Sequence, residues 1–305
     1  MEGRSARRVI MDDRARLEVP FVKMQGLGND YLYIDRFAYR AEHDWSALSR
    51  AMSDRHFGAG SDGIILIEPP EKPAAADFHM RMFNADGSEG DMCGNGMRCF
   101  ARYAYDRGLT RKTELEVETR AGVIRPRIRL KDGSVDSVSV DMGTPVFSRK
   151  DIPISRRDGP EPAVGEPVDL EGRVLRGTAL SMGNPHCVFF VDDVWGIDLA
   201  HIGPKLERHP LFPRRANIEF VAVRSRDCID MRVWERGSGI TLACGTGASA
   251  AVVAAVLSGF ADRDAPVTVN LPGGPLSVEW KGDGHVWQTG PAEEVYSGVF
   301  FYETR

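Results

Sequence analysis

Cysteine is scarce in this chain, with five in 305 residues, at positions 93, 99, 187, 228 and 244. The odd number and irregular spacing give no disulfide framework, so we expect reduced thiols and a cytoplasmic location. The sequence has no Cys-x-x-Cys pair and no clustered Cys/His ligands, and we therefore expect no metal site.

Long apolar runs and an excess of positive charge are also missing. The longest largely apolar run, Ala248–Leu257, is too short to cross a bilayer. The 39 basic and 44 acidic residues give a net charge of −5, so we expect neither a membrane nor a nucleic-acid partner. Residues 1–20 are Arg-rich, aperiodic and without the apolar core of a signal peptide. We expect a disordered N-terminal tail there, with Met11 as an alternative start.

An internal repeat with an offset of 151 residues is the main positive feature. The motif Cys-Gly-x-Gly begins at Cys93 and again at Cys244, and an ungapped window of 29 residues around it holds seven identities. In each copy a strand-like segment, Met80–Asn84 or Met231–Glu235, ends nine positions before the cysteine. A helix-like segment that ends in glycine follows each motif.

Weaker similarities flank the motif in the same order, which two coincidentally similar loops would not explain. The pairs are Gly28–Asp35 with Gly183–Asp192, Ser61–Glu68 with Ala216–Val223, and Leu115–Ile128 with Val267–Trp280. The chain therefore reads as two homologous halves that face each other.

Short strands dominate the expected secondary structure, with examples at residues 135–141, 173–180 and 285–289. Helices are expected at residues 44–52, 96–106, 198–208 and 247–257, the last buried on all sides, and a surface loop at 155–168. This pattern predicts an α+β fold of two pseudo-symmetric domains, each a mixed, largely antiparallel β-roll or barrel around a central helix. We expect an N-terminal half at 21–138, a C-terminal half at 139–291, a strand at about 292–305 that returns to the first half, and the active site between the halves.

A cysteine placed directly before a helix lies beside unpaired backbone N–H groups at the positive end of the helix dipole. This environment is expected to lower the thiol pKa, and the same N–H groups can bind a carboxylate. Two such thiols, related by a pseudo-two-fold axis, suit inversion at a carbon atom. One removes a proton as thiolate and the other returns a proton to the opposite face. We find no fingerprint of a pyridoxal enzyme and expect no cofactor.

From Phe21 onward the chain resembles the diaminopimelate epimerase family along nearly its whole length. The segments that carry the resemblance are FVKMQGLGNDYLYID, RHFGAGSDGIILIEPP, MRMFNADGSEGDMCGNGMRCFARY, SMGNPHCVFFVDD, NIEFV, WERGSGITLACGTGASAAV and LPGGPLSVEW. The resemblance implies the fold of that family and a cofactor-independent homodimer. It further implies that two cysteines interconvert LL- and meso-diaminopimelate, for lysine and peptidoglycan synthesis.

By position, the resemblance makes Cys93 and Cys244 the acid/base pair. The groups that it implies for the substrate are Gly94, Asn95, Gly245 and Thr246 for the α-carboxylate, Asn84, Asn217, Glu235 and Arg236 for the distal end, and Asn29 and Asn184 along the pocket. His186 and Glu235 would tune the protonation of the thiols.

Each of these assignments has a structural alternative. Asn29 and Asn184 follow glycine and would also fit as turn caps, Glu235 and Arg236 as a surface ion pair, and His186 as a structural histidine. Burial as small hydrophobic residues is the usual role of free cysteines. We assign it to Cys99, Cys187 and Cys228, although Cys187 lies next to His186.

Three positions depart from the pattern of the family. Gly63 stands where some members have glutamine, so a contact between side chain and substrate is expected to be missing. Ile240 stands where a glutamate is common, and Ser238 replaces a common alanine.

Three other functions compete with the epimerase. A proline racemase or hydroxyproline epimerase shares the thiol pair but usually has His where this chain has Asn95, and it has no use for the distal groups. A non-catalytic amino-acid-binding protein would not need the thiols. A thiol–disulfide oxidoreductase would need a Cys93–Cys244 disulfide, which we expect to inactivate the protein.

Overall fold

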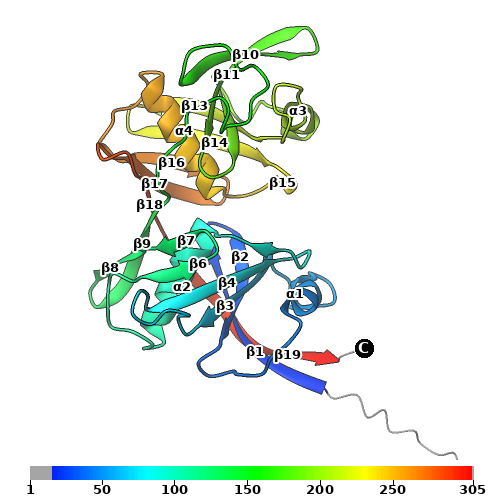
Figure 1. Ribbon diagram of the computed structural model, residues 1–305, viewed down its shortest axis with the longest axis vertical. Coiled ribbons are helices and arrows are strands. Elements are labelled where there is room, and N and C mark those ends of the chain that lie inside the picture. The colour runs from blue at the N-terminus through cyan, green and yellow to red at the C-terminus, as the bar shows by residue number, and fades with distance from the viewer. Residues whose placement is uncertain (1–15, 304–305) are drawn as a thin grey trace, which may run out of the picture.

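The computed structural model describes residues 16–303, which form two sheets, each around one helix (Figure 1). The helices are α1 (Trp45–Ser53), α2 (Gly94–Asp106), α3 (Leu199–Glu207) and α4 (Gly245–Leu257). They lie within two residues of the expected ranges, so these predictions are confirmed. No helix in the described part of the chain is long and apolar enough to cross a membrane.

The first sheet has the strand order β19-β1-β2-β3-β4-β6-β7, and β5 pairs with β4. Its strands are β1 (Arg16–Gly26), β2 (Asn29–Asp35), β3 (Gly63–Glu68), β4 (Phe78–Asn84), β5 (Glu89–Gly90), β6 (Val117–Thr119), β7 (Gly122–Ile124) and β19 (Glu293–Glu303).

The second sheet has the order β10-β11-β12-β13-β14-β16-β17-β18-β9-β8, and β15 pairs with β14. Its strands are β8 (Arg127–Lys131), β9 (Ser134–Asp141), β10 (Ala163–Leu170), β11 (Arg173–Ser181), β12 (Pro185–Phe190), β13 (Asn217–Ser225), β14 (Cys228–Glu235), β15 (Gly239–Ile240), β16 (Val267–Leu271), β17 (Gly274–Trp280) and β18 (Val286–Gly290).

The repeat seen in the sequence is also a repeat of strand pairing. β2 runs parallel to β3, β3 antiparallel to β4, and β4 parallel to β6. The same sequence of directions recurs through β12, β13, β14 and β16. Two sheets with one recurring order of strand directions, each around one helix, confirm the predicted α+β fold of two similar halves.

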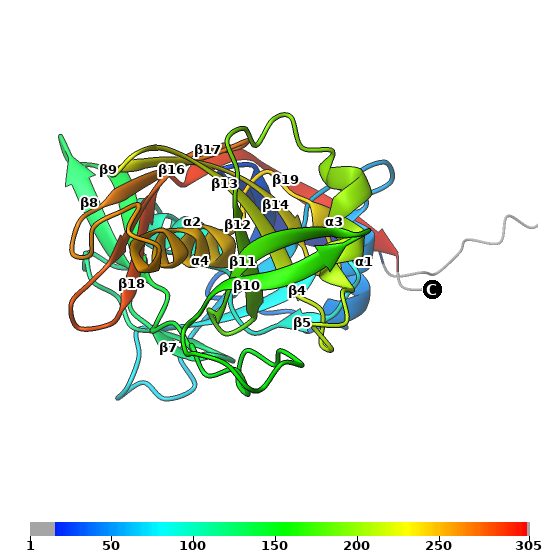
Figure 2. The same cartoon turned by 90° about the horizontal axis from the view of Figure 1, so that it is seen from above.

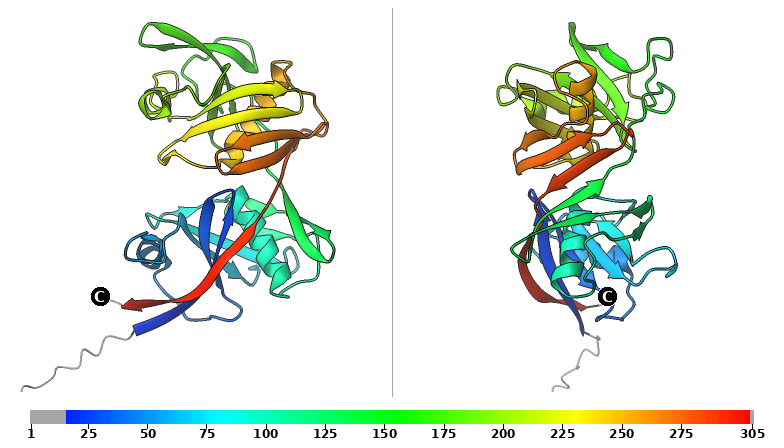
Figure 3. Two further views of the ribbon diagram at one scale, coloured as in Figure 1. Left: turned by 180° about the vertical axis from the view of Figure 1, so that it is seen from behind. Right: turned by 90° about the vertical axis from the view of Figure 1, so that its left-hand side faces the viewer.

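Strands cross between the halves at two places. β9 pairs with β18 of the second sheet and also packs on α2. β19 follows β18 but pairs with β1 in the first sheet, and it can be followed from one half to the other in Figure 3. The expected boundary between residues 138 and 139 falls inside β9 and remains a prediction.

Two expectations are wrong at their edges. The disordered tail was expected to reach residue 20, but residues 16–20 pair with β19, and Val19 is fully buried. Residues 1–15 of that tail lie outside the described residues. The loop expected at 155–168 ends at residue 162, because β10 begins at Ala163. Ala163 and Val168 are fully buried, and the prolines and glycine that hid this strand are tolerated because β10 lies at the edge of the sheet.

The two central helices contact each other where the halves meet, and α4 overlies α2 when the molecule is seen from above (Figure 2). As expected, α4 is buried on nearly all sides, from Gly247 to Ala255. Gln288 on β18 lies between the first turns of the two helices. A Cβ atom on Gly245 would lie 2.9 Å from its Oε1, and one on Gly94 would lie 3.4 Å from it. The N-terminal ends of α2 and α4 therefore lie close to each other, on either side of the Gln288 side chain.

Candidate active site

Both cysteines of the repeated motif are helix N-caps with nearly the same backbone geometry. Cys93 has φ −134° and ψ 118°, and Cys244 has φ −122° and ψ 111°. Each sulfur accepts the backbone N–H three residues on, from Gly96 or Gly247, at 3.4 Å. Because the cap is a cysteine and not one of the usual capping residues, the sequence placed both helix starts two residues late.

The second glycine of each motif allows close packing beneath the helix. A Cβ atom on Gly96 would lie 2.7 Å from the side chain of Ile65, and one on Gly247 would lie 2.9 Å from Glu219 Oε1. The two halves therefore place different chemical groups at the same point, an aliphatic side chain under α2 and a carboxylate under α4.

A cavity of about 840 Å³ lies between the halves, and both cysteines line it. Most of the residues that the sequence nominated for the site also line it: Asn29, Asn84, Cys93, Gly94, Asn95, Asn184, Glu235, Arg236, Cys244, Gly245 and Thr246. His186 and Asn217 do not. They lie behind the wall on β12 and β13, where His186 is fully buried and Asn217 is 3% exposed.

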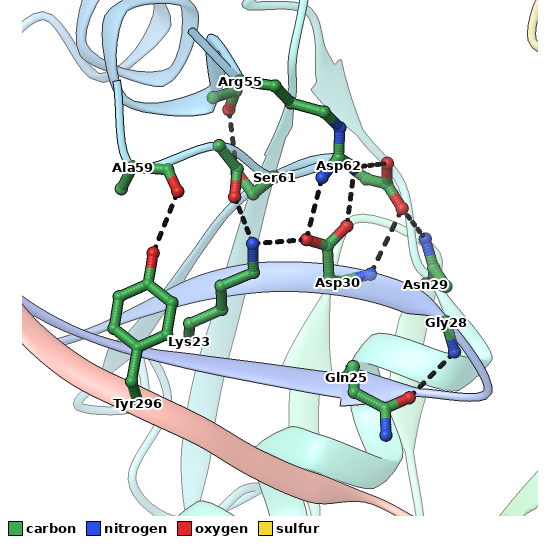
Figure 4. Close-up of polar contacts among 12 residues, drawn as sticks. Lys23, Gln25, Gly28, Asn29, Asp30, Arg55, Ala59, Ser61, Asp62 and Tyr296 are labelled. Atoms are coloured by element: carbon green, nitrogen blue, oxygen red, sulfur yellow. Dashed lines mark hydrogen bonds and ion pairs between the residues drawn. The ribbon is translucent and has the colours of Figure 1, made fainter. Parts of the chain in front are cut away.

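On the first half, Cys93 contacts a polar network carried by β1, β2 and the loop before β3. Its sulfur donates to Asn29 Oδ1 at 3.3 Å, and Asn29 Nδ2 donates to Asp62 Oδ2 at 2.7 Å. Arg55 bonds to both Asp62 and Asp30 (Figure 4). Asp62 and Arg55, both of which line the cavity, were not predicted, because their link to Asn29 depends on a fold that brings the loop before β3 next to the start of β2.

On the second half, the partner of Cys244 is the Thr246 hydroxyl at 3.6 Å. Asn184 Nδ2 lies 3.4 Å from that hydroxyl, and Asn184 Oδ1 lies 2.8 Å from His186 Nε2. The other ring nitrogen of His186 lies 2.7 Å from the buried Glu219. His186 therefore reaches the cysteine through Asn184 and Thr246. Glu219 was not predicted from the sequence.

The pKa of both thiols is raised, so the expectation of a lowered pKa is wrong: the N–H groups at the helix starts do lower it, but burial outweighs them. Burial raises the pKa of Cys93, although the Gly96 N–H and Arg98 act to lower it. Burial, Glu235 and Glu219 raise the pKa of Cys244 well above its ordinary value. The cost of burying a charged sulfur exceeds what the helix N–H groups return. A thiolate formed in this site is consequently a stronger base than one in water.

The other three cysteines are structural. Cys99 and Cys187 are buried, and burial raises the pKa of Cys99 to about 11. Cys187 lies in the apolar core of the second half and does not line the cavity. Cys228 is half-buried and accepts from Asn270 Nδ2 at 3.4 Å.

The far end of the cavity carries Asn84, Glu235 and Arg236. Asn217 Oδ1 accepts the backbone N–H of Arg236 at 2.8 Å, so Asn217 positions Arg236 from behind. Glu235 accepts from the Thr241 hydroxyl, and no ion pair joins it to Arg236 within residues 16–303. The guanidinium of Arg236 bonds only the Arg214 carbonyl oxygen, at 3.2 Å, among the hydrogen bonds of the described residues.

Of the three departures from the family pattern, Gly63 begins β3, and the other two lie together on the cavity wall. A Cβ atom on Gly63 would lie 2.1 Å from the Phe83 carbonyl oxygen and 2.9 Å from Tyr31. A larger residue therefore does not fit there, and Tyr31 lines the cavity instead. Ile240 and Ser238 are exposed and line the cavity beside Arg236.

Solved structures with the same architecture are distant in sequence. A phenazine biosynthesis protein of the PhzF family from Bacillus anthracis is 15% identical with a TM-score of 0.68, covering 93% of this chain and 99% of that one. A hydroxyproline epimerase from Agrobacterium vitis is 14% identical with a TM-score of 0.66, covering 95% and 94%. The fold is thus the two-domain architecture that these proteins share.

Sequence relatives are much closer and define the family. The profile of the diaminopimelate epimerase family matches residues 21–148 and 178–295. Diaminopimelate epimerases from Moorella thermoacetica and Desulfitobacterium hafniense are 51% and 49% identical, covering 92% and 91% of this chain and 98% and 96% of those proteins. The chain belongs to the diaminopimelate epimerase family and is an isomerase.

Proposed function

We propose that this protein interconverts LL- and meso-diaminopimelate by passing a proton between Cys93 and Cys244. The observation that carries the proposal is the placement of two cysteines, each capping a central helix, on one cavity between the halves. Membership of the family supports diaminopimelate as the substrate. The two cysteine caps on one cavity support a mechanism in which two thiols exchange a proton with it.

In this scheme one thiolate removes the α-proton, and the electron pair of the C–H bond remains on the substrate as a carbanion. The thiol on the opposite face then gives its proton to the same carbon, which inverts the centre and leaves a thiolate there. Backbone N–H groups at Gly94, Asn95, Gly245 and Thr246 receive the α-carboxylate and stabilise the charge that develops on it. No cofactor takes part in these steps.

The distal end of the substrate would be bound by Arg236 and the side chains around it. The Arg236 guanidinium can donate two parallel hydrogen bonds to a carboxylate, and the Glu235 carboxylate can accept hydrogen bonds from an ammonium group. Asn217 holds the backbone of Arg236 and Asn84 lies across the cavity. These groups would have no partner in proline, which favours a diamino-dicarboxylate over the proline racemase alternative.

We further propose a cytoplasmic homodimer. β19 is the edge strand of the first sheet, and the apolar side chains of Val295 and Val299 on it are 53% and 47% exposed. Pairing of such an edge with a second copy would cover them. Light scattering coupled to size-exclusion chromatography tests this, and a monomer at micromolar concentration would contradict it.

The test of the activity is incubation of the reduced protein with LL-diaminopimelate in deuterium oxide. We expect deuterium at the α-carbon and accumulation of the meso isomer. Absence of both would reject the proposal, and exchange with proline but not with diaminopimelate would support the racemase.

A further inference from the structure

The Asn29 amide lies between Cys93 and a carboxylate that fixes which way it faces. Its Nδ2 donates to Asp62 Oδ2 at 2.7 Å, and its Oδ1 accepts from the Cys93 sulfur at 3.3 Å. A carboxylate accepts hydrogen bonds and has none to give, so Asp62 admits only the NH2 group of Asn29. The carbonyl oxygen is therefore left facing the sulfur.

Asp62 is itself held at both of its oxygens. Oδ1 accepts from Arg55 Nη2 at 2.9 Å, and Oδ2 accepts from the Asp30 backbone N–H at 3.2 Å. Asp30 in turn bonds Arg55 and pairs with Lys23 at 2.7 Å. Figure 4 shows these side chains converging on Asp62 and Asn29 from β1, β2 and the segment before β3. Because these contacts hold the carboxylate in place, rotation of the Asn29 amide would break its bond to Asp62 and set two acceptor oxygens against each other.

We infer that Asp62 is a positioning residue, which holds the Asn29 carbonyl oxygen toward Cys93 and so favours the thiol form of that cysteine. An amide oxygen can accept a hydrogen bond from a thiol but has none to donate to a thiolate. The role in catalysis rests on the proposed function, in which Cys93 would then supply the proton and Cys244 would act first as base. The effect on the protonation of Cys93 does not depend on any substrate.

Other groups that face Cys93 remain in place when Asp62 is changed. Arg98 on α2 lowers the pKa of Cys93, and Glu235 on β14 raises it. Tyr31 on β2 interacts with both Cys93 and Asn29, and its own pKa is raised well above the ordinary value by burial and by Cys93 and Asp62. It remains a neutral phenol throughout the range of the test below.

The test is the pH dependence of iodoacetamide labelling at Cys93 and Cys244 in the reduced, substrate-free protein, measured by mass spectrometry of the two peptides. In Asp62→Asn the new amide can donate, so Asn29 can turn its NH2 group toward the sulfur and stabilise the thiolate. We expect labelling of Cys93 at pH 7 to rise about tenfold, equivalent to a pKa about one unit lower. Labelling of Cys244 should change less than about twofold, and Asp62→Glu should restore slow labelling of Cys93.

Asp30→Asn is the matched control, because it removes the same charge from the same cluster but leaves the bond from Asn29 to Asp62. We expect labelling of Cys93 to stay within about twofold of the wild type. Asp62 is 38% exposed and asparagine has nearly its shape, so the fold should be retained and is checked by circular dichroism.

Unchanged labelling of Cys93 in Asp62→Asn would overturn the inference. An equal rise of Cys93 labelling in Asp30→Asn would overturn it too, because loss of one negative charge would then explain the result without any change at Asn29. Because labelling needs no turnover, a protein that fails to epimerise diaminopimelate would reject the proposed function and still allow this measurement.

Discussion

The two halves hold their cysteines in one backbone frame and surround them with different side chains. Each sulfur accepts an N–H at 3.4 Å from the second glycine of its motif. Beyond that bond, the Cys93 thiol donates a hydrogen bond to an amide oxygen, whereas Cys244 lies 3.6 Å from a hydroxyl that can donate to it. When one of the two cysteines is a thiol and the other a thiolate, the hydrogen bonds alone therefore favour Cys93 as the thiol.

The nearby charges differ in the opposite sense. Arg98 lowers the pKa of Cys93, and Glu235 and Glu219 raise the pKa of Cys244 after burial. By charge alone, the proton is better placed on Cys244. An enzyme that works in both directions must hold both arrangements within reach, and two preferences that oppose each other contribute to this. In the proposed reaction, where one proton passes between the two thiols, their titration would belong to the pair and not to either cysteine alone.

Removal of either active-site sulfur is expected to have the largest effect on activity, because it leaves only one half with a thiol in the cavity. In Cys93→Ala or Cys244→Ala one proton carrier is missing, so we expect epimerisation to fall by a factor of about 10² to 10⁴ or more. Cys228→Ala is the control, because this half-buried cysteine does not line the cavity. The measurement is the conversion of LL to meso isomer, with circular dichroism to show an intact fold. Near wild-type turnover in either active-site variant would contradict transfer between two bases.

Glu219 is the clearest chemical difference between the halves, since the corresponding place under Gly96 holds Ile65. Burial raises the pKa of Glu219, against the opposite effect of His186. A carboxyl whose folded pKa lies above its unfolded value adds stability below the unfolded pKa, and this stability is lost as the pH rises through the folded pKa.

Glu219→Gln removes that titration and keeps the size of the side chain. From about pH 4.5 upward, we therefore expect the wild type to lose stability relative to the variant, by about 1.4 kcal/mol for each unit of the pKa shift. Urea unfolding at pH 4 and pH 8 measures the difference. Two pH profiles that run parallel would show that the folded pKa of Glu219 is not raised.

Arg98 is the second difference, and its counterpart in α4 at the 151-residue offset is Ser249. The guanidinium is fully buried, its Nε donates to the Pro291 carbonyl oxygen at 3.1 Å, and its Nη1 and Nη2 have no hydrogen-bond partner in the described structure. Arg98→Met should leave stability unchanged or raise it, since it removes an unpaired buried charge.

The same variant should raise the pKa of Cys93 and slow its labelling by iodoacetamide at pH 7 about threefold to tenfold, without changing Cys244. A drop in melting temperature together with unchanged labelling would assign Arg98 a purely structural role.

Local signals in the sequence predicted the secondary structure around the site. The hydrogen-bond network of the site depends on tertiary contacts and was not predicted. The repeat, the four helices and the caps at Cys93 and Cys244 follow from spacing and glycine placement within a few residues. The link from Asp62 to Asn29 joins residues 33 positions apart across two parallel strands. Nothing in either segment alone marks it.

His186 and Asn217 show the same limit. The sequence nominated both by resemblance, but their register places them opposite each other on β12 and β13, behind the cavity wall. Proximity in sequence to a motif does not reveal whether a side chain faces the cavity or the core, because successive residues of a strand point to opposite faces. Asn217 bonds the backbone of Arg236 and His186 bonds Asn184, so both reach the cavity through a neighbour that lines it.

Ile240 offers the mildest way to make the halves more alike. At the same offset its counterpart is Glu89 on β5, which bonds Arg81 at 2.8 Å. The second half has Arg232 in place of Arg81, but that side chain donates to the backbone oxygens of Val194 and Ile197. A carboxylate at position 240 would therefore not have in Arg232 the partner that Glu89 has in Arg81.

Ile240→Glu should act on Cys244 as Glu235 does, raising its pKa, but weakly, because Ile240 is 48% exposed and water screens the new charge. We expect kcat/KM to fall by about threefold or less at low salt and the loss to shrink as salt is added, with Ile240→Gln unchanged. Steady-state kinetics at two ionic strengths provide the comparison. A loss beyond about thirtyfold, or an equal loss in Ile240→Gln, would show that the isoleucine shapes the cavity itself and not only the charge around Cys244.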